Sequence, residues 1–231
     1  MDGSLITALG LGFVLGLGHA LDADHVVAVS TLVSQGRGVL RSCLRGAYWG
    51  LGHTLALLSA GAAVFALKVQ ISPELEHGLE TAVGAMLVLL GGHVLFRALG
   101  AVSLHRHEHV HGGAPHRHLH VHVGDRGEHR HLHLWREAPQ PLLVGLLHGL
   151  AGSGALVLLV LVSLPSPAAA LAYILVFGAG STAGMLVLSG LIGVPFALTA
   201  GSSRTAALVL RVIVGCGSVL VGLSMIVNGL A

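Results

Sequence analysis

Histidine and aspartate gather inside a mostly apolar stretch near the N-terminus. Residues 5–33 contain His19, Asp22, Asp24 and His25. On a helix His19, Asp22 and His25 share a face, because steps of three and four residues bring side chains together. Asp24 lies on that face only if the helix is locally unwound. Acids are costly in lipid, and imidazole with carboxylate suits Ni²⁺, Co²⁺ or Zn²⁺, so the pattern predicts a metal site with these four residues as ligands.

An alternative is that the two acids make structural ion pairs with arginine or histidine elsewhere. Three later histidines also lie in apolar stretches, namely His53, His93 and His148. His53 lies in the next stretch, which runs antiparallel, so we predict that it meets the first group at similar depth and binds the same metal. For His93 and His148 we predict one further ligand each, the alternative for His93 being a hydrogen bond between helices.

Residues 101–138 hold eleven of the seventeen histidines. They form three similar cassettes, His105–His109, His116–His120 and His129–His133. Tracts of this composition are typical of metal binding, and without an apolar core the segment is expected to be flexible. We predict a metal-binding loop that buffers or senses cations, the alternative being an ordinary solvated linker.

The composition excludes a water-soluble domain. Hydrophobic residues make up 54% of the 231 residues and charged residues 10%, against about 25% charged in soluble domains. Mean hydropathy is +0.84, and the 34 glycines suit close helix packing in lipid. Six stretches are long enough to cross a bilayer: 5–33, 46–67, 79–100, 140–164, 168–198 and 206–229. The first and fifth exceed a straight span, which indicates broken or tilted helices.

The two halves of the chain resemble each other. Gly16–Leu21 recurs as Gly145–Leu150 and Gly50–Thr54 as Gly178–Thr182, and the glycines of the third stretch recur in the sixth, at offsets of 129, 128 and 131 residues. Thus His148 is the repeat mate of His19. Three helices per copy force the second copy to insert upside down. We predict an all-α integral membrane protein with six transmembrane helices as two inverted three-helix repeats, 1–100 and 139–231, joined by the His-rich loop 101–138.

Arginine placement predicts the orientation. If the chain crosses the membrane six times, all eleven arginines fall on one side and the single lysine, Lys68, on the other. Because cytoplasmic loops carry the excess of basic residues, we predict a multi-pass protein of the cell (inner) membrane with both termini outside and the His-rich loop in the cytoplasm.

His19-Ala-Leu-Asp22-Ala-Asp24-His25 resembles the signature of the nickel/cobalt transporter (NiCoT) family, and Gly52-His53-Thr54 resembles its second motif. The stretch Leu146–Ser153 is similar to shorter NicO-type and UreH-type relatives. The resemblance implies metal transport, with His19, Asp22, Asp24, His25 and His53 in metal selection. In that wider group a His-rich loop occurs in exporters as well as importers, so the direction stays open.

We therefore predict a secondary permease for Ni²⁺ or Co²⁺, with Zn²⁺ possible. It is expected not to be an enzyme, to hold no cofactor and to bind no nucleic acid; a homo-oligomer or a metallochaperone is a possible partner. One alternative is a membrane subunit that senses nickel or delivers it to an enzyme such as urease. A thiol–disulfide carrier would need paired cysteines at equivalent repeat positions, and Cys43 and Cys216 are not equivalent.

Overall fold

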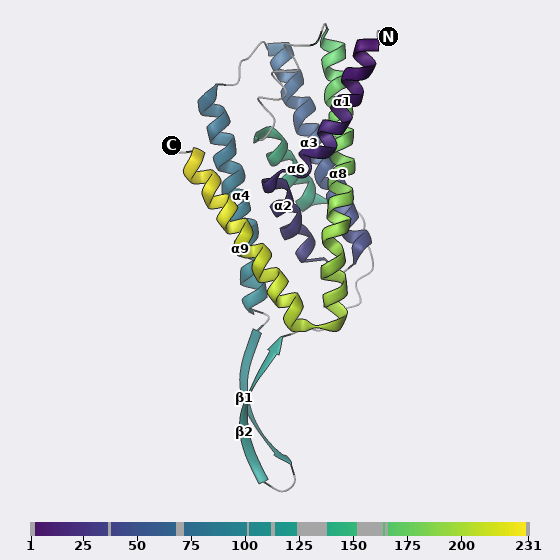
Figure 1. The fold of residues 1–231 in the computed structure, drawn as a ribbon. Helices are drawn as coiled ribbons and strands as arrows, with labels where there is room; N and C mark the ends of the chain where they lie inside the picture. The colour runs from purple at the N-terminus through teal and green to yellow at the C-terminus, as the bar shows by residue number, and fades with distance from the viewer. Residues whose placement is uncertain are drawn as a thin grey trace.

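The computed structural model describes residues 3–36, 38–67, 72–100, 102–111, 114–123, 138–151, 164 and 166–229. Within these ranges lie seven helices and one β-hairpin (Figure 1). The elements are α1 (Gly3–His19), α2 (Ala23–Ser34), α3 (Val39–Leu67), α4 (Pro73–Gly100), β1 (Val102–His111), β2 (Ala114–Val123), α6 (Pro139–Ala151), α8 (Pro167–Ser202) and α9 (Arg204–Gly229). Each of the six predicted apolar stretches contains a helix, and the first contains two.

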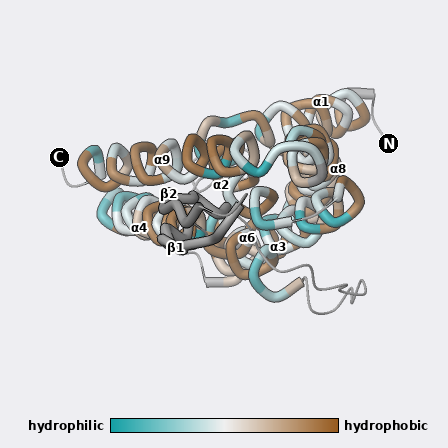
Figure 2. Tube along the Cα trace, turned by 90° about the horizontal axis from the view of Figure 1, so that it is seen from below, coloured by the Kyte–Doolittle hydropathy of each residue, from teal (hydrophilic) through white to brown (hydrophobic). Residues whose placement is uncertain are grey.

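The helical part is that of a multi-pass membrane protein. Three described helices, α4, α8 and α9, are long and apolar enough to cross a bilayer, and α1 with α2 passes the same test as one bent pair. Large apolar side chains cover the outside, including Leu89 (74% exposed) and Phe96 (78%). Soluble proteins rarely expose so much apolar surface, and Figure 2 shows hydrophobic residues along the outer helices. The described spans therefore number three, or four with the bent pair.

The first apolar stretch is broken into two helices. α1 ends at His19, a tight turn follows, and α2 starts at Ala23 with its axis bent by 58°. Backbone bonds Leu21 N to Gly18 O (2.9 Å) and Asp22 N to His19 O (3.1 Å) close that turn. The fifth stretch is instead one continuous helix, α8, of 36 residues, about 54 Å long, which is longer than the roughly 30 Å of a bilayer core.

The packing contacts of the first half are repeated by the equivalent helices of the second half. α3 lies along α8 and α4 along α9, while α1 packs on α8 and α6 on α3. At the crossings a glycine lies against backbone so closely that a Cβ would collide with it. These contacts are Gly16 with Phe177 and Gly145 with Trp49, Gly180 with Phe13 and Gly52 with Leu142, and Gly84 with Gly222 and Gly91 with Gly215. Each contact made by a glycine of one half thus has a counterpart made by a glycine at the equivalent position of the other half.

Two arginines hold the C-terminal end of α2. Arg45 of α3 donates from Nη1 to the carbonyl of Leu32 (2.6 Å), and Arg211 of α9 donates from Nε to the carbonyl of Ser34 (3.3 Å). The last carbonyls of a helix lack partners within the helix and carry partial negative charge. The two arginines thus fix the end of a short helix whose first turn carries Asp24 and His25.

The His-rich segment contains a β-hairpin where the sequence led us to expect flexible chain. β1 pairs antiparallel with β2, from Val102 opposite Val123 to His111 opposite Ala114. In Figure 1 the hairpin projects from the end of the bundle opposite to both chain termini. The third cassette, 129–133, lies outside the described residues.

Candidate metal centre

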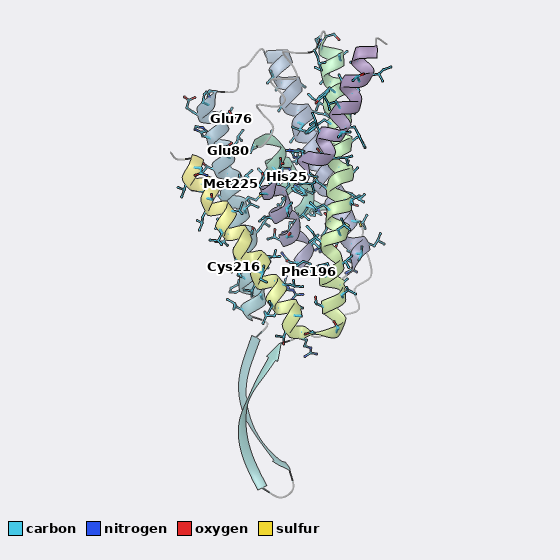
Figure 3. All side chains as sticks on the ribbon, in the orientation of Figure 1. His25, Glu76, Glu80, Phe196, Cys216 and Met225 are labelled. Carbon is cyan, nitrogen blue, oxygen red and sulfur yellow. The ribbon has the colours of Figure 1, made fainter. Side chains whose placement is uncertain are left out.

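Four buried histidines converge where α1 breaks into α2. His19 is the last residue of α1, His25 lies in the first turn of α2, His53 in α3 and His148 in α6. Their exposed fractions are 8%, 0%, 0% and 0%. Figure 3 shows His25 about halfway along the bundle, away from Glu76 and Glu80 near one end.

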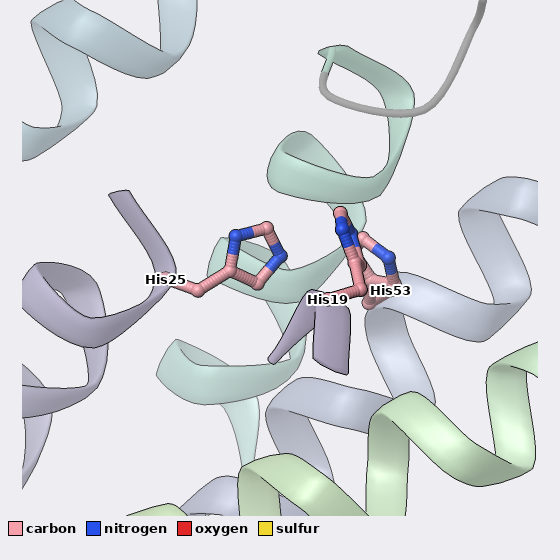
Figure 4. A group of neighbouring side chains, drawn as sticks. All are labelled: His19, His25 and His53. Atoms are coloured by element: carbon pink, nitrogen blue, oxygen red, sulfur yellow. The ribbon is translucent and has the colours of Figure 1, made fainter. Parts of the chain in front are cut away.

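The ring of His25 lies at the centre of the group. Its centroid is 4.4 Å from that of His19, 5.4 Å from that of His53 and 4.3 Å from that of His148. Figure 4 shows the imidazoles of His19 and His53 on one side of a small space and that of His25 on the other. The break in the first span produces this arrangement, because α2 approaches the group from a different direction than α1.

Two overlapping sets of donor atoms could hold a cation. One consists of His19, His25 and His53, and the other of Asp24, His25 and His148; within each set the donor atoms lie within 4.8 Å of one another. Ligands on opposite sides of a metal with bonds of about 2.1 Å are roughly 4.2 Å apart. Small side-chain movements would therefore bring either set into coordination.

The two aspartates are hydrogen-bonded to the histidine rings. Asp22 Oδ2 lies 2.8 Å from His19 Nδ1. Asp24 bridges two rings, with Oδ1 at 3.0 Å from His25 Nδ1 and Oδ2 at 2.8 Å from His148 Nε2. Asp22 occupies the N-cap position of α2 yet makes no side-chain cap bond, although aspartate is favoured there for that bond. Its carboxylate orients His19 instead.

These bonds leave ring nitrogens directed at the centre. A carboxylate only accepts hydrogen bonds, so the Nδ1 atoms of His19 and His25 carry the protons and their Nε2 atoms keep a lone pair. Both Nε2 atoms are buried without a partner among the described residues, as are both ring nitrogens of His53. A carboxylate bonded to the far nitrogen is how proteins orient metal-binding histidines. His19, His25 and His53 thus each offer a ring nitrogen without a partner to a cation, and Nδ1 of His148 also has none among the described residues.

His53 is expected to reduce the stability of the metal-free protein. Each buried polar atom without a partner costs about 1–3 kcal/mol, and His53 has two. His53→Leu, of similar size, should therefore raise the free energy of unfolding in EDTA by about 2–6 kcal/mol and the unfolding temperature by about 4–24 °C, at the usual 2–4 °C per kcal/mol for this chain length. Thermal unfolding in detergent measures this. Saturating Ni²⁺ should stabilise the wild type more than the variant; a lower unfolding temperature of the variant than of the wild type in EDTA would contradict the expectation.

The structure brings together six of the seven residues predicted as ligands. Asp22 and Asp24 contact histidine rings, and His148 reaches the group through Asp24. His93 is exposed on α4 and belongs to neither donor set. Gly91, two residues earlier, packs on Gly215, and a step of two residues turns a helix by about 200°. His93 therefore faces away from the bundle.

The predicted alternative of structural ion pairs is present in part, since Asp24 pairs with His148 from a distant helix. Sequence reasoning missed Trp49. Its fully buried indole lies 5.2 Å from the ring of His25 and 5.6 Å from that of His148. A signal in the sequence was its place four residues before His53, one helical turn away. Phe177 also contacts the group, 5.4 Å from the ring of His19.

Comparison with known proteins identifies the family of the chain. The profile of the NicO family, described as "High-affinity nickel-transport protein", matches residues 5–227. A protein named "Urease accessory protein UreH" from Bacillus sp. (strain TB-90) is 39% identical over 206 residues, covering 87% of this chain and 82% of that protein. No solved structure matches. The chain belongs to the NicO family of nickel-transport proteins.

Proposed function

We propose that this protein carries Ni²⁺ through the cell membrane on His19, His25 and His53, with Co²⁺ as a second cargo and Zn²⁺ as a competitor. The observation that carries the proposal is the set of unpaired imidazole nitrogens buried at a helix break inside an apolar bundle. Membership of a nickel-transport family supports Ni²⁺ as the first cargo. Imidazole also accepts the other two ions, so geometry must set the preference.

Three neutral imidazoles form an incomplete coordination shell for a divalent cation. They leave coordination positions open to water, as in sites that exchange ligands. Asp22 and Asp24 contribute negative charge and hold the rings by hydrogen bonds. The C-terminal end of α1, at His19, adds partial negative charge. The cation is thereby stabilised in an apolar surrounding and can still be released.

The transport mechanism we propose is alternating access between two inverted three-helix repeats that form six spans. The reciprocal glycine contacts support a pseudo-twofold relation between the halves. Thr54 supports it too, since it lies 3.3 Å from its repeat mate Thr182 at the crossing of α3 and α8. A broken helix at the interface of inverted repeats is a known location for cation sites. Movement of one repeat against the other would expose the histidines to each side in turn.

The proposed orientation puts both termini outside and the hairpin in the cytoplasm. The arginines of the sequence support it, since all eleven fall on the hairpin side in a six-span topology. The sequence has no nucleotide-binding loop of the GxxxxGK[ST] type, so an ion gradient or the membrane potential is proposed to drive transport. No bond is made or broken, and the protein is proposed not to be an enzyme.

One relative favours a second candidate. The Bacillus protein is named a urease accessory protein, so nickel handled by this chain could serve an enzyme such as urease. In that alternative the chain senses or delivers nickel as a membrane subunit and does not itself transport it. The buried donor set in the middle of the bundle favours transport, because a delivery surface needs no ligands at that depth.

Reconstitution separates the two candidates. Purified protein in liposomes, with no other component, is expected to move ⁶³Ni²⁺ across the bilayer when a membrane potential is imposed, and protein-free liposomes are not. Flux with the potential in each direction also gives the permitted direction of transport. Tight nickel binding without flux under any gradient would overturn the transport proposal and favour the delivery subunit.

A further inference from the structure

The crossing of α3 and α8 lies at the level of the histidine cluster. His53 of α3 and Ser181 of α8 occupy equivalent positions of the two repeats, and both side chains are fully buried. Their neighbours Thr54 and Thr182 are in contact, with 3.3 Å between the hydroxyl oxygens. α3 runs away from the hairpin end of the bundle, and α8 runs toward it (Figure 1). Residues one turn before His53 and one turn after Ser181 therefore lie on the same side of the site.

Two pairs of apolar residues occupy the positions one helical turn from this crossing. On the side of the hairpin they are Trp49 and Met185, both fully buried in the larger apolar cluster. On the side of the chain termini they are Leu57 and Phe177, which are 1% and 6% exposed and pack in one cluster with Ile174. We call the first pair the hairpin-side lid and the second pair the terminal-side lid. Among the described residues, the histidines thus lie between two buried apolar layers.

The internal repeat exchanges the two lids. At the offset of 128 residues, Trp49 corresponds to Phe177 and Leu57 corresponds to Met185. Each lid therefore combines an aromatic residue of one repeat with a non-aromatic apolar residue of the other. A core that only holds helices together needs no such exchange, whereas alternating access between inverted repeats needs an equivalent barrier on each side of the site.

The aromatic rings of the lids contact equivalent histidines. The ring of Phe177 lies 5.4 Å from that of His19, and the ring of Trp49 lies 5.6 Å from that of His148, the repeat mate of His19. His19 belongs to one donor set and His148 to the other. Each lid therefore adjoins one of the two donor sets.

Buried apolar side chains are a barrier to a divalent cation. A hydrophobic constriction blocks ions by excluding water, and an ion without water or ligands is strongly disfavoured in apolar surroundings. Passage through either lid therefore requires that its side chains separate. While both lids are closed, as they are here, the cation is occluded from both ends of the bundle.

We propose that the two lids are the gates of the transport cycle and that they open in turn. Leu57 and Phe177 separate to admit the cation on the side of the termini, and Trp49 and Met185 separate on the side of the hairpin. His25 belongs to both donor sets, so it would keep hold of the cation between the two openings. The cargo rests on the proposed function, whereas the gates rest on packing and on the equivalence of the repeats.

Cysteine labelling at the level of the site tests each lid separately. Ser181→Cys places a thiol between the lids, and Cys43→Ser with Cys216→Ser removes the native thiols. A positively charged, membrane-impermeant methanethiosulfonate reagent is added to right-side-out or inverted membrane vesicles without added metal. A protease-cleavable tag at the N-terminus shows which vesicles expose the chain termini. The measured quantity is the rate of labelling from each side.

Each lid is opened by substitutions in both helices. Phe177→Ala and Leu57→Ala are expected to raise the rate from the side of the termini at least about tenfold, which equals about 1.4 kcal/mol in the opening equilibrium. Trp49→Ala and Met185→Ala should do the same from the side of the hairpin. In each case the rate from the opposite side should not rise. Phe96→Ala is the control, because this ring is 78% exposed on α4, and it should change neither rate.

The side of labelling separates a gate from a packed core. Substitutions that only loosen a helix would group Trp49 with Leu57 and Phe177 with Met185, and would raise labelling from both sides. That grouping, or parental rates in all well-folded variants, would overturn the proposal. Gel filtration checks folding, and Phe177→Leu or Trp49→Phe replaces an alanine variant that does not fold. Labelling needs no Ni²⁺, so absence of liposome flux would overturn the proposed transport without changing the result for the lids.

Discussion

His25→Ala is expected to lower the affinity for Ni²⁺ by at least about 100-fold and to abolish measurable flux into liposomes. His25 belongs to both donor sets, so its loss leaves neither with three ligands. Even residues that only orient metal ligands change affinity by about 10–100-fold, and a ligand at the centre of the group should exceed that range. Among the described residues of the site, His25 alone has this position.

Trp49 provides a direct measure of binding. Its indole lies 5.2 Å from the ring of His25, so a bound paramagnetic Ni²⁺ should quench its fluorescence. The second tryptophan, Trp135, is removed by Trp135→Phe in every protein compared. Titration with Ni²⁺ then gives the affinity of the membrane site separately from that of the hairpin.

His93→Ala is the matched control for His25→Ala. Both histidines lie in membrane helices, but His93 is exposed and outside the donor sets. Its replacement should leave affinity and flux within about twofold of wild type, since exposed substitutions away from such features change little. His25→Gln fills the space that alanine leaves and guards against misfolding. Wild-type flux in well-folded His25→Gln protein would contradict the proposed site, and loss of flux in His93→Ala would restore His93 as a ligand.

The sequence predicted the components of the site better than their roles. His19, Asp22, Asp24 and His25 stand out because charge in an apolar stretch is costly. The internal repeat indicated His148, as the mate of His19. The sequence did not predict the direction in which each donor atom points. That direction depends on where α1 ends, and a 58° bend changes which side chains face the same space.

His93 and the hairpin are two other features whose arrangement could not be predicted from the sequence. A helical step of two residues reverses a side chain's direction, and the sequence does not state that Gly91 is the residue that packs on α9. In the loop, composition indicated metal binding, while the alternation of histidines carried a strand signal of period two. The register of the two strands, with His105 opposite His120, could not be predicted from this alternation alone.

Asp24→Asn is expected to weaken Ni²⁺ binding by about 10–100-fold, and Asp22→Asn by less than tenfold. Asp24 is only 24% exposed and bridges two buried rings, whereas Asp22 is 56% exposed and bonds one. The two bonds use different oxygens of Asp24, so asparagine could accept from only one of the rings and would present an NH₂ to the other. The negative charge beside the site would be lost, and one of the two rings would no longer be held by a carboxylate. Titration with Trp49 fluorescence measures the order of the two effects.

Asp24→Asn also distinguishes the two donor sets. The loop histidines are first replaced in every protein compared, because nickel bound there would add to the same signal. If the cation binds His19, His25 and His53, X-ray absorption at the nickel edge should then show three imidazoles with Asp24 intact and, at saturating Ni²⁺, in Asp24→Asn. If Asp24, His25 and His148 bind the cation, the protein with Asp24 intact should show two imidazoles and Asp24→Asn should lose its nickel signal. An Asp22→Asn effect equal to or larger than that of Asp24→Asn would contradict the bridging role. In the first case Asp24 acts by holding two rings in place, and the three imidazoles alone bind the cargo, as expected of a site that must release it.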